Sequence, residues 1–390
     1  MNIMYEFFPY MTNDDSVGLY NPEFNDIYHS AFGAVIEAYE KFVCPSLKYI
    51  DNFNKNVRVL DICYGIGYNT KVFLNELLKN KETDKNFYID CVDTDKVLFE
   101  LSPFIKNKID FINKLRYKKL LYKNINNYYE AKKIVSLKQK NLNYKINTKV
   151  NKIILLNLIK NFGVEFLSEE SKKNLVKKEN LPFFDKDILI FMKNLLKSEV
   201  YLLKKENKST FVHNIYYGYI SKRIKNTKKR LYFENFDINF YPTDIRQYLL
   251  NHSTSYDIIF LDGFTPAKCP CIWSVEFFKE LFNHINSKGI IVTYNMSAPV
   301  RFAMKEAGFY IGNIISNDNK NIGTIASKTK DNIFYPLSIE QEGLLNTKAG
   351  IPYRDENLIL ENDKILLNRI HEVEDSNLIS SSKYLKGCSK

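Results

Sequence analysis

The chain has 390 residues, of which 45% are hydrophobic, and a formal net charge of +11. This composition excludes a disordered chain, and no apolar run reaches the roughly 18 residues of a membrane span, so we expect no membrane partner. The N-terminus lacks the basic and apolar regions of a secretory signal. The six cysteines follow neither a disulfide framework nor zinc spacing, which predicts a reduced, cytoplasmic protein without a metal.

The positive charge is concentrated in one internal block. Residues 104–230 contain 31 Lys and Arg and 10 Asp and Glu, a net of +21, whereas the remainder of the chain carries a net of −10. Two interpretations stay open, namely a solvated lysine-rich surface and an electrostatic footprint for a phosphate backbone. We interpret residues 104–235 as a basic, mainly helical insertion.

The first elements predict a strand–helix–strand unit. Residues 17–20 are typical of a short strand, and 33–42 have helical spacing. Residues 57–63 (VRVLDIC) then indicate a buried strand, which a glycine turn joins to an apolar helical stripe beginning near 70. A second strand is predicted over 87–92. A glycine turn after the first strand and an acid after the second are typical of cofactor-binding α/β folds.

Strand and helix alternation resumes after the insertion. The pattern predicts a strand and helix over 238–249, a strand over 256–262, a helix over 275–285, a strand over 289–295, a helix over 300–307, and strands over 309–315 and 322–327. The expected fold is therefore α/β, with a mostly parallel sheet and a C-terminal antiparallel hairpin. We expect four parts: 1–103, the insertion 104–235, the second half of the sheet in 236–360, and a tail over 361–390.

The glycine turn indicates a nucleoside cofactor. Glycines at Gly65 and Gly67 let backbone approach a ligand where a Cβ would clash, and Asn69 is expected to cap the following helix. The turn is not GxGxxG, because Cys63 occupies the first glycine position, so a dinucleotide pyrophosphate fits poorly. S-adenosylmethionine fits better, with Asp61 facing its cationic end. An ordinary tight turn is the alternative.

Two more acids follow predicted strands. Asp93 is placed to accept hydrogen bonds from both ribose hydroxyls, with Asp95 as a competitor and a solvated turn acid as the alternative. Asp244 is placed either to reach the adenine amino group or to cap the helix that starts at Ile245, and both roles are compatible.

The segment after the strand over 256–262 has the strongest catalytic signal. Asp262 stands at a strand end, where it can hold an incoming amine and take up its surplus proton. Phe264 can stack on a base, and Lys268 can meet a phosphate or the substrate. Trp273, the only tryptophan, completes the cluster. Each residue alone is more often structural, so the prediction rests on their clustering.

These motifs resemble a known family. LDGFTPAKCPCIW over 261–273 resembles the signature L-D-G-F-x-P-x-K-x-P-x-x-W of the methyltransferase domain of the tRNA 5-methylaminomethyl-2-thiouridine biosynthesis proteins, the MnmC family. LDICYGIGYN resembles its L-E-I-G-F-G-T-G-L-N, with Asp61 for its Glu and Cys63 for its Gly. The opening segment is similar at Tyr28 and Glu37, and GIPYRDENL over 350–358 resembles a C-terminal motif. The resemblance covers roughly 13–95 and 236–358.

The resemblance implies a class I, Rossmann-like methyltransferase. Asp262 is then the catalytic carboxylate with Phe264 beside it, and the residues over 61–69 with Asp93 and Asp244 hold S-adenosylmethionine. Lys268, Trp273, Tyr28 and Glu37 are expected near the substrate, the wobble uridine of a tRNA anticodon arm. No second dinucleotide fingerprint occurs, which predicts a form without the family's FAD oxidase.

A separate enzyme, FAD-dependent or otherwise, is then a candidate source of the free amine. Two rival functions stay open. One is an aminopropyltransferase acting on a small amine, against which the basic block argues. The other is a catalytically inactive RNA-binding protein, with Cys63 as the lesion.

Overall fold

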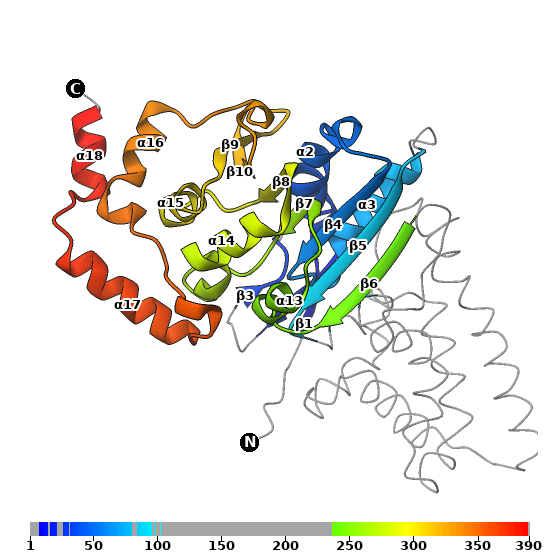
Figure 1. The fold of residues 1–390 in the computed structure, drawn as a ribbon, viewed down its shortest axis with the longest axis horizontal. Helices are drawn as coiled ribbons and strands as arrows, with labels where there is room; N and C mark the ends of the chain where they lie inside the picture. Colours follow the sequence, from blue (N-terminus) through cyan, green and yellow to red (C-terminus); the bar gives the residue numbers. More distant parts are fainter. Residues whose placement is uncertain are drawn as a thin grey trace, which may run out of the picture. The chain divides into compact units, whose positions relative to one another are not determined.

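The computed structural model describes residues 8–14, 16–21, 26–30, 32–79, 84–95, 98, 102 and 236–388 (Figure 1). The chain divides into two compact units. The first unit consists of Met1–Glu37, Tyr64–Thr83 and Asp95–Pro242. The second unit consists of Ala38–Cys63, Asp84–Thr94 and Thr243–Lys390. The basic segment over 104–235 lies outside the described residues. Its expected helical fold, and the four parts drawn around it, therefore stay predictions.

The first unit contains a small antiparallel sheet that goes beyond the single strand expected over 17–20. Its strands are β1 (Phe8–Met11), β2 (Val17–Asn21) and β3 (Asp26–Ile27). The unit also contains α3 (Tyr68–Lys79), which follows the glycine turn, and β6 (Phe236–Pro242). The helix expected over 33–42 is present as α1 (Ala34–Ala38), which continues into a π-helix (Tyr39–Val43) and α2 (Cys44–Leu47).

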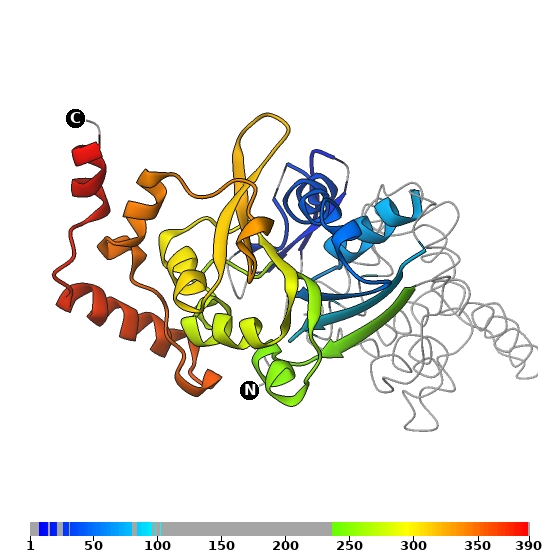
Figure 2. The same ribbon diagram turned by 45° about the horizontal axis from the view of Figure 1, so that its top comes forward.

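A mostly parallel sheet forms the centre of the second unit. Its hydrogen-bonded neighbours follow the order β5-β4-β7-β8-β10-β9. The strands β5 (Asn86–Asp93), β4 (Asn56–Ile62), β7 (Tyr256–Leu261) and β8 (Ile285–Thr293) run parallel. The strands β10 (Asn321–Ser327) and β9 (Tyr310–Ile315) form an antiparallel hairpin, which Figure 2 shows in yellow and orange at the top. The expected fold class is confirmed.

The composition of β7 explains its central position. All six residues of the strand are buried, Asp257 among them, and the other five form the largely apolar sequence that is typical of a parallel strand covered on both faces. The helix after it, α14 (Val275–Asn283), is capped by Ser274, whose Oγ accepts a hydrogen bond from the backbone N–H of Phe277 at 3.2 Å. The neighbouring helices are α13 (Ile245–Asn251) and α15 (Ala298–Glu306).

Element boundaries differ from the expectation at β8. The strand begins at Ile285 rather than at Gly289, because Ile285 already pairs with Tyr256 of β7. The chain ends in α16 (Ile339–Leu345), α17 (Asn362–Asp375) and α18 (Ser381–Cys388), and Figure 1 shows α17 and α18 at the outer end of this unit. Among the described helices, none combines the length and the apolar composition needed to cross a membrane.

Candidate active site

The carboxyl edge of the parallel sheet brings two of the predicted acids to one level. The register pairs Ile62, the last residue of β4, with β5 and β7 on its two sides. The residues one position further along the three strands are Cys63, Asp93 and Asp262. The backbone N–H of Asp262 donates to the carbonyl of Ile62 at 3.3 Å, which extends the ladder beyond the strands. Both carboxylates are half-buried at this edge.

The thiol of Cys63 lies among the acids. Burial raises its pKa well above the ordinary value, and the charges of Asp93, Cys271, Asp262 and Asp61 raise it further. The charges of both strand-end acids, of Cys271 and of Asp61 therefore act on this thiol, and Asp61 is fully buried on β4. The backbone of Cys63 has φ 60°, the left-handed conformation that glycine adopts freely. Cys63 thus has the backbone conformation that is expected of the glycine at this position in the family's motif.

The loop that follows Asp262 is held from several sides. A Cβ added to Gly263 would lie 2.0 Å from Cδ1 of Ile272, so only glycine fits there without a shift. The carbonyl of Gly263 accepts from the hydroxyl of Tyr294 at 2.8 Å. The indole Nε1–H of Trp273 donates to the carbonyl of Phe264 at 2.8 Å. The backbone that carries the candidate catalytic residues is therefore rigidly supported.

The predicted substrate residues of this loop differ in exposure. Trp273 is completely buried, where its ring lies edge-to-face with Tyr294 at 6.1 Å. The structure therefore places Trp273 as a support for the backbone of Phe264. Lys268 is half-buried, and its backbone N–H donates to Thr265 at 2.8 Å. A substrate contact by either side chain stays a prediction.

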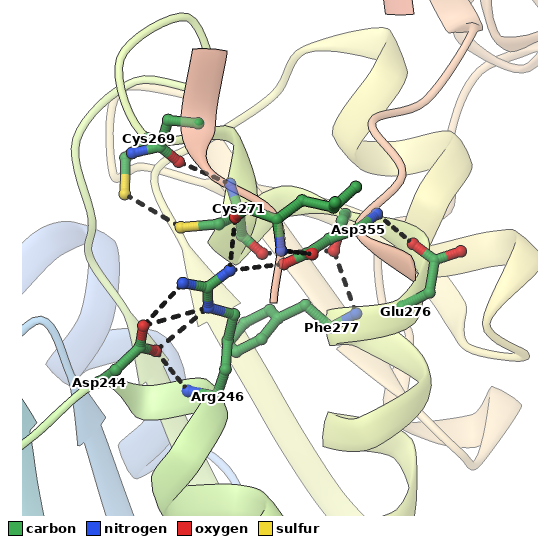
Figure 3. Close-up of polar contacts among 10 residues, drawn as sticks. Asp244, Arg246, Cys269, Cys271, Glu276, Phe277 and Asp355 are labelled. Atoms are coloured by element: carbon green, nitrogen blue, oxygen red, sulfur yellow. Dashed lines mark hydrogen bonds and ion pairs between the residues drawn. The ribbon is translucent and has the colours of Figure 1, made fainter. Parts of the chain in front are cut away.

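Asp244 belongs to a charge network that the sequence did not reveal (Figure 3). Its carboxylate accepts from the backbone N–H of Arg246 at 2.8 Å, so its expected role as helix cap is confirmed. The guanidinium of Arg246 lies 2.7 Å from Asp244 and 2.8 Å from Asp355. Asp355 is fully buried and also accepts from the backbone N–H of Leu360 at 2.8 Å. The adenine contact of Asp244 stays a prediction.

Arg246 and Asp355 are the residues that sequence reasoning missed. The sequence signal for Asp355 is the motif GIPYRDENL over 350–358, which contains this residue but does not distinguish it from its neighbours. The backbone N–H of Asp355 donates to the carboxylate of Glu276 at 2.7 Å, and this hydrogen bond holds the motif against α14 (Figure 3). The C-terminal motif thus fixes the position of Asp244 through one arginine.

Two thiols adjoin this network. The sulfur atoms of Cys269 and Cys271 are 3.7 Å apart, within the range of a weak hydrogen bond (Figure 3). The hydrogen bond from Cys269 lowers the pKa of Cys271, against the effect of burial, and the charge of Arg246 lowers it further. The charge of Arg246 therefore acts on both thiols.

The glycine turn in the first unit has the conformation that its sequence predicted. Gly65 has φ 56° and Gly67 has φ 81°, both in the left-handed region. The helix α3 begins at Tyr68, so Asn69 lies inside its first turn rather than at the capping position expected for it. Asn69 is buried, with 5% of its surface exposed.

Replacing Gly67 with alanine is expected to damage the turn. A Cβ at this position would lie 2.2 Å from the hydroxyl of Tyr64, and a side chain at positive φ adds a strain of about 1–2 kcal/mol. We expect Gly67→Ala to lower both the melting temperature and the calorimetric affinity for S-adenosylhomocysteine. Gly387→Ala is the control, since nothing lies within 4 Å of its added Cβ. Equal effects of the two variants would contradict the role of the turn.

A buried lysine holds the same turn. The Nζ of Lys71 donates to the carbonyl of Ile66, which lies between the two glycines, at 2.7 Å, and to the carbonyl of Ser102 at 2.9 Å. The hydroxyl of Ser102 donates to the same Ile66 carbonyl at 2.7 Å. Burial lowers the pKa of Lys71 from 10.5 to about 7. Above about pH 7, the side chain therefore favours its neutral form in the folded protein.

This lysine predicts a pH dependence of stability. Between pH 7 and 10.5 the unfolded chain binds a proton at Lys71 that the folded chain does not, so stability rises with pH across this window. The contribution is fully present above pH 10.5 and is lost as the pH falls to about 7. Urea unfolding of the protein and of Lys71→Met at pH 7, 8 and 9 measures it. As the pH rises from 7 to 9, the free energy of unfolding of the unaltered protein should increase relative to that of Lys71→Met. Parallel pH profiles of the two proteins would contradict this.

The N-terminal residues of the resemblance lie in the first unit. Glu37 accepts a hydrogen bond from the backbone N–H of Ser30 at 3.0 Å, and Tyr28 donates its backbone N–H to Leu19 at 2.9 Å. Asp14 caps α1 by accepting from the backbone N–H groups of the residues at 35 and 36, each at 3.0 Å. Glu37 thus orders the segment before its helix, and its contact with a substrate stays a prediction.

Comparisons with known proteins indicate a methyltransferase-like chain. Residues 206–329 match the model of a family described as S-adenosyl-L-methionine-dependent methyltransferase. An uncharacterized protein of Methanocaldococcus jannaschii is 31% identical over 154 residues, 38% of this chain and 43% of that protein. The tRNA 5-methylaminomethyl-2-thiouridine biosynthesis bifunctional protein MnmC of Ralstonia nicotianae is 33% identical over 75 residues, 19% of this chain and 11% of that protein. The chain thus spans less than half the length of these relatives.

A solved structure shares the fold. The crystal structure of MNMC2 from Aquifex aeolicus aligns with a TM-score of 0.56 over 95% of this chain and 86% of that chain, at 19% sequence identity. The likeness to the methyltransferase domain of the MnmC proteins, inferred from the motifs over 261–273 and 60–69, is therefore confirmed, as is the α/β fold class.

Proposed function

We propose that this chain is an S-adenosylmethionine-dependent tRNA methyltransferase. It converts 5-aminomethyluridine, or its 2-thio form, at the wobble position to the 5-methylaminomethyl nucleoside. The observation that carries this proposal is the pair of carboxylates, Asp93 and Asp262, that the strand register brings to the carboxyl edge of the sheet on either side of Cys63, with Asp262 leading into a rigidly supported loop. In open α/β sheets this edge is where ligands bind. The family match over 206–329 supports the cofactor.

The residues present suit S-adenosylmethionine chemically. When bound, this cofactor supplies a methyl group on a positively charged sulfur. Asp61 would balance that charge, and Asp93 would accept from the ribose hydroxyls. Asp244, with 33% of its side chain exposed, keeps an open side for the adenine amino group while Arg246 fixes its orientation. Gly65 and Gly67, with Asn69 following, would present backbone without a Cβ in the way.

Asp262 is the proposed catalytic residue. Its half-buried carboxylate would accept a hydrogen bond from the substrate's amine, aim the nitrogen lone pair and take up the proton that the nitrogen releases. Phe264 would pack against the uridine ring. Lys268 and Trp273 from the same loop, and Tyr28 and Glu37 from the N-terminal segment, are the remaining candidates for holding the substrate.

The proposed partner is the anticodon arm of a tRNA. Its wobble base lies in a single-stranded loop, so it can splay out and stack. The net charge of +21 over 104–230 supports binding to phosphates, although that segment lies outside the described residues. Such binding is expected to weaken steeply as salt is raised.

Mass spectrometry of tRNA from a deletion strain tests the proposed function. Accumulation of 5-aminomethyl-2-thiouridine supports it, whereas an unchanged level of the methylated nucleoside refutes it. Two further measurements separate the rival functions. Absence of any heat of binding with S-adenosylhomocysteine supports an inactive RNA-binding protein. Turnover of a small polyamine that is indifferent to added tRNA supports an aminopropyltransferase.

A further inference from the structure

An open hollow of about 90 Å³ in the second unit is not used by the proposed chemistry. One side is formed by aromatic residues, among them Tyr49, Phe334 and Tyr335, and the other by the end of β9 over 313–317. Lys48 stands at its rim with an exposed ammonium group, and Glu40 also lines it. We call this hollow the aromatic pocket.

The ring of Phe334 is fixed in place although it faces solvent. It stacks on Tyr49 with a centroid distance of 5.3 Å and an interplanar angle of 11°. Tyr49 is itself buried, and its hydroxyl donates to the carbonyl of Asn332 at 2.6 Å. Burial raises the pKa of Tyr49 to about 12, so the phenol stays neutral and keeps this bond. Phe334 nevertheless exposes 55% of its surface, and Tyr335 exposes 49%.

The β9 side of the aromatic pocket lies at the same edge of the sheet as Asp262, whereas Tyr49 is joined through Asn332 to the carbonyl of Lys288, nearer the start of β8. Thr293, at the carboxyl end of β8, pairs with Thr324 of β10, which pairs with Asn313 of β9. The end of β9 is therefore level with the ends of the parallel strands. Three strand spacings separate β7 from β9 in the order β7-β8-β10-β9, which places the end of β9 about 14 Å from the strand that carries the catalytic candidate.

We propose that the aromatic pocket stacks a base of the RNA loop that flanks the reacting nucleotide. A ring held in one plane loses little freedom when a flat base covers it, and every base has a face that can stack. The ammonium of Lys48 is placed to meet the phosphate beside that base. Because the end of β9 lies three strand spacings across the sheet from β7, the pocket would take another base of the loop rather than the reacting one. This inference rests on the proposed function only in taking RNA as the partner.

Fluorescence anisotropy with a labelled, unmodified anticodon stem-loop RNA tests the pocket. Phe334→Ala should weaken binding on the order of 10-fold, whereas Phe334→Tyr should bind like the unaltered protein because it keeps the stack. Tyr310→Ala is the matched control. Tyr310 exposes 49% of its surface, close to the 55% of Phe334, but it stands at the amino end of β9. All variants should bind S-adenosylhomocysteine with unchanged affinity, which shows that they are folded.

Two outcomes would overturn the pocket's role. One is RNA affinity that Phe334→Ala leaves unchanged. The other is sedimentation showing that the unaltered protein self-associates and that Phe334→Ala abolishes this, which would make the pocket a contact between copies. Because the binding assay needs no turnover, its result is independent of the proposed reaction. RNA binding that depends on Phe334 without methyl transfer would remove the proposed reaction and keep the pocket.

Discussion

Asp262→Asn is expected to lower kcat on the order of 100-fold or more, because general acid–base groups contribute factors of this size. An amide cannot take up the proton that the amine nitrogen releases, although it keeps one oxygen to accept a hydrogen bond. The backbone of the loop should remain in place, since it is held by Tyr294 through Gly263 and by Trp273 through Phe264. Affinity for S-adenosylhomocysteine should therefore stay close to that of the unaltered protein.

Asp257→Asn provides a matched control at the other end of β7. Asp257 is buried and accepts hydrogen bonds from the backbone N–H of Arg58 at 2.8 Å and from the side chain of Asn286 at 2.7 Å. Its replacement should lower stability and leave kcat nearly unchanged. Steady-state kinetics together with calorimetry separate the two effects. If Asp262→Asn abolishes cofactor binding instead, the carboxylate holds the cofactor and the role proposed for it is wrong.

Arg246→Met is expected to destabilise the protein by about 3–5 kcal/mol, because it removes one partner of a buried ion pair. The carboxylate of Asp355 has no exposed surface, so it would be left charged without its cation. Asp244 would lose the guanidinium that lies 2.7 Å from it. A lower affinity for S-adenosylhomocysteine should therefore accompany the loss of stability, and urea unfolding with calorimetry measures both.

Arg354→Met is the control for this network. Arg354 neighbours Asp355 in sequence and pairs with Glu306 at 2.9 Å, but 41% of its side chain is exposed. Ion pairs at such exposure contribute about 1 kcal/mol or less. A loss of stability in Arg246→Met no greater than that in Arg354→Met would show that the buried network does not organise the site.

The fold was predictable because its strands have strong local patterns. YDIIFL in β7 and VRVLDI in β4 are mostly apolar segments of strand length, and the chain turns after each of them. The start of β8 was not predictable in this way. Ser287 and Lys288 near its start are exposed, and they join the strand because Ile285 pairs with Tyr256 in a distant part of the chain. Pairing between remote segments leaves no local signal.

The candidate site likewise has residues that could be predicted from the sequence and contacts that could not. The sequence alone locates Asp61, Asp93 and Asp262, because each follows apolar residues near the carboxyl end of a predicted strand, where ligands bind in α/β sheets. The link from Asp244 through Arg246 to Asp355 joins segments 109 positions apart, and only the folded chain reveals it. Trp273 shows what only the structure adds, because its buried indole supports the loop through the carbonyl of Phe264, while its contact with a substrate stays a prediction.

A crystal structure with S-adenosylhomocysteine bound tests the central claim most directly. The claim is that the carboxyl edge formed by β4, β5 and β7 holds the methyl donor next to the carboxylate of Asp262. The expected result is the sulfur atom beside that carboxylate, with the ribose hydroxyls on Asp93. Sulfur density remote from Asp262, or a protein that takes up no ligand at saturating concentration, would contradict it.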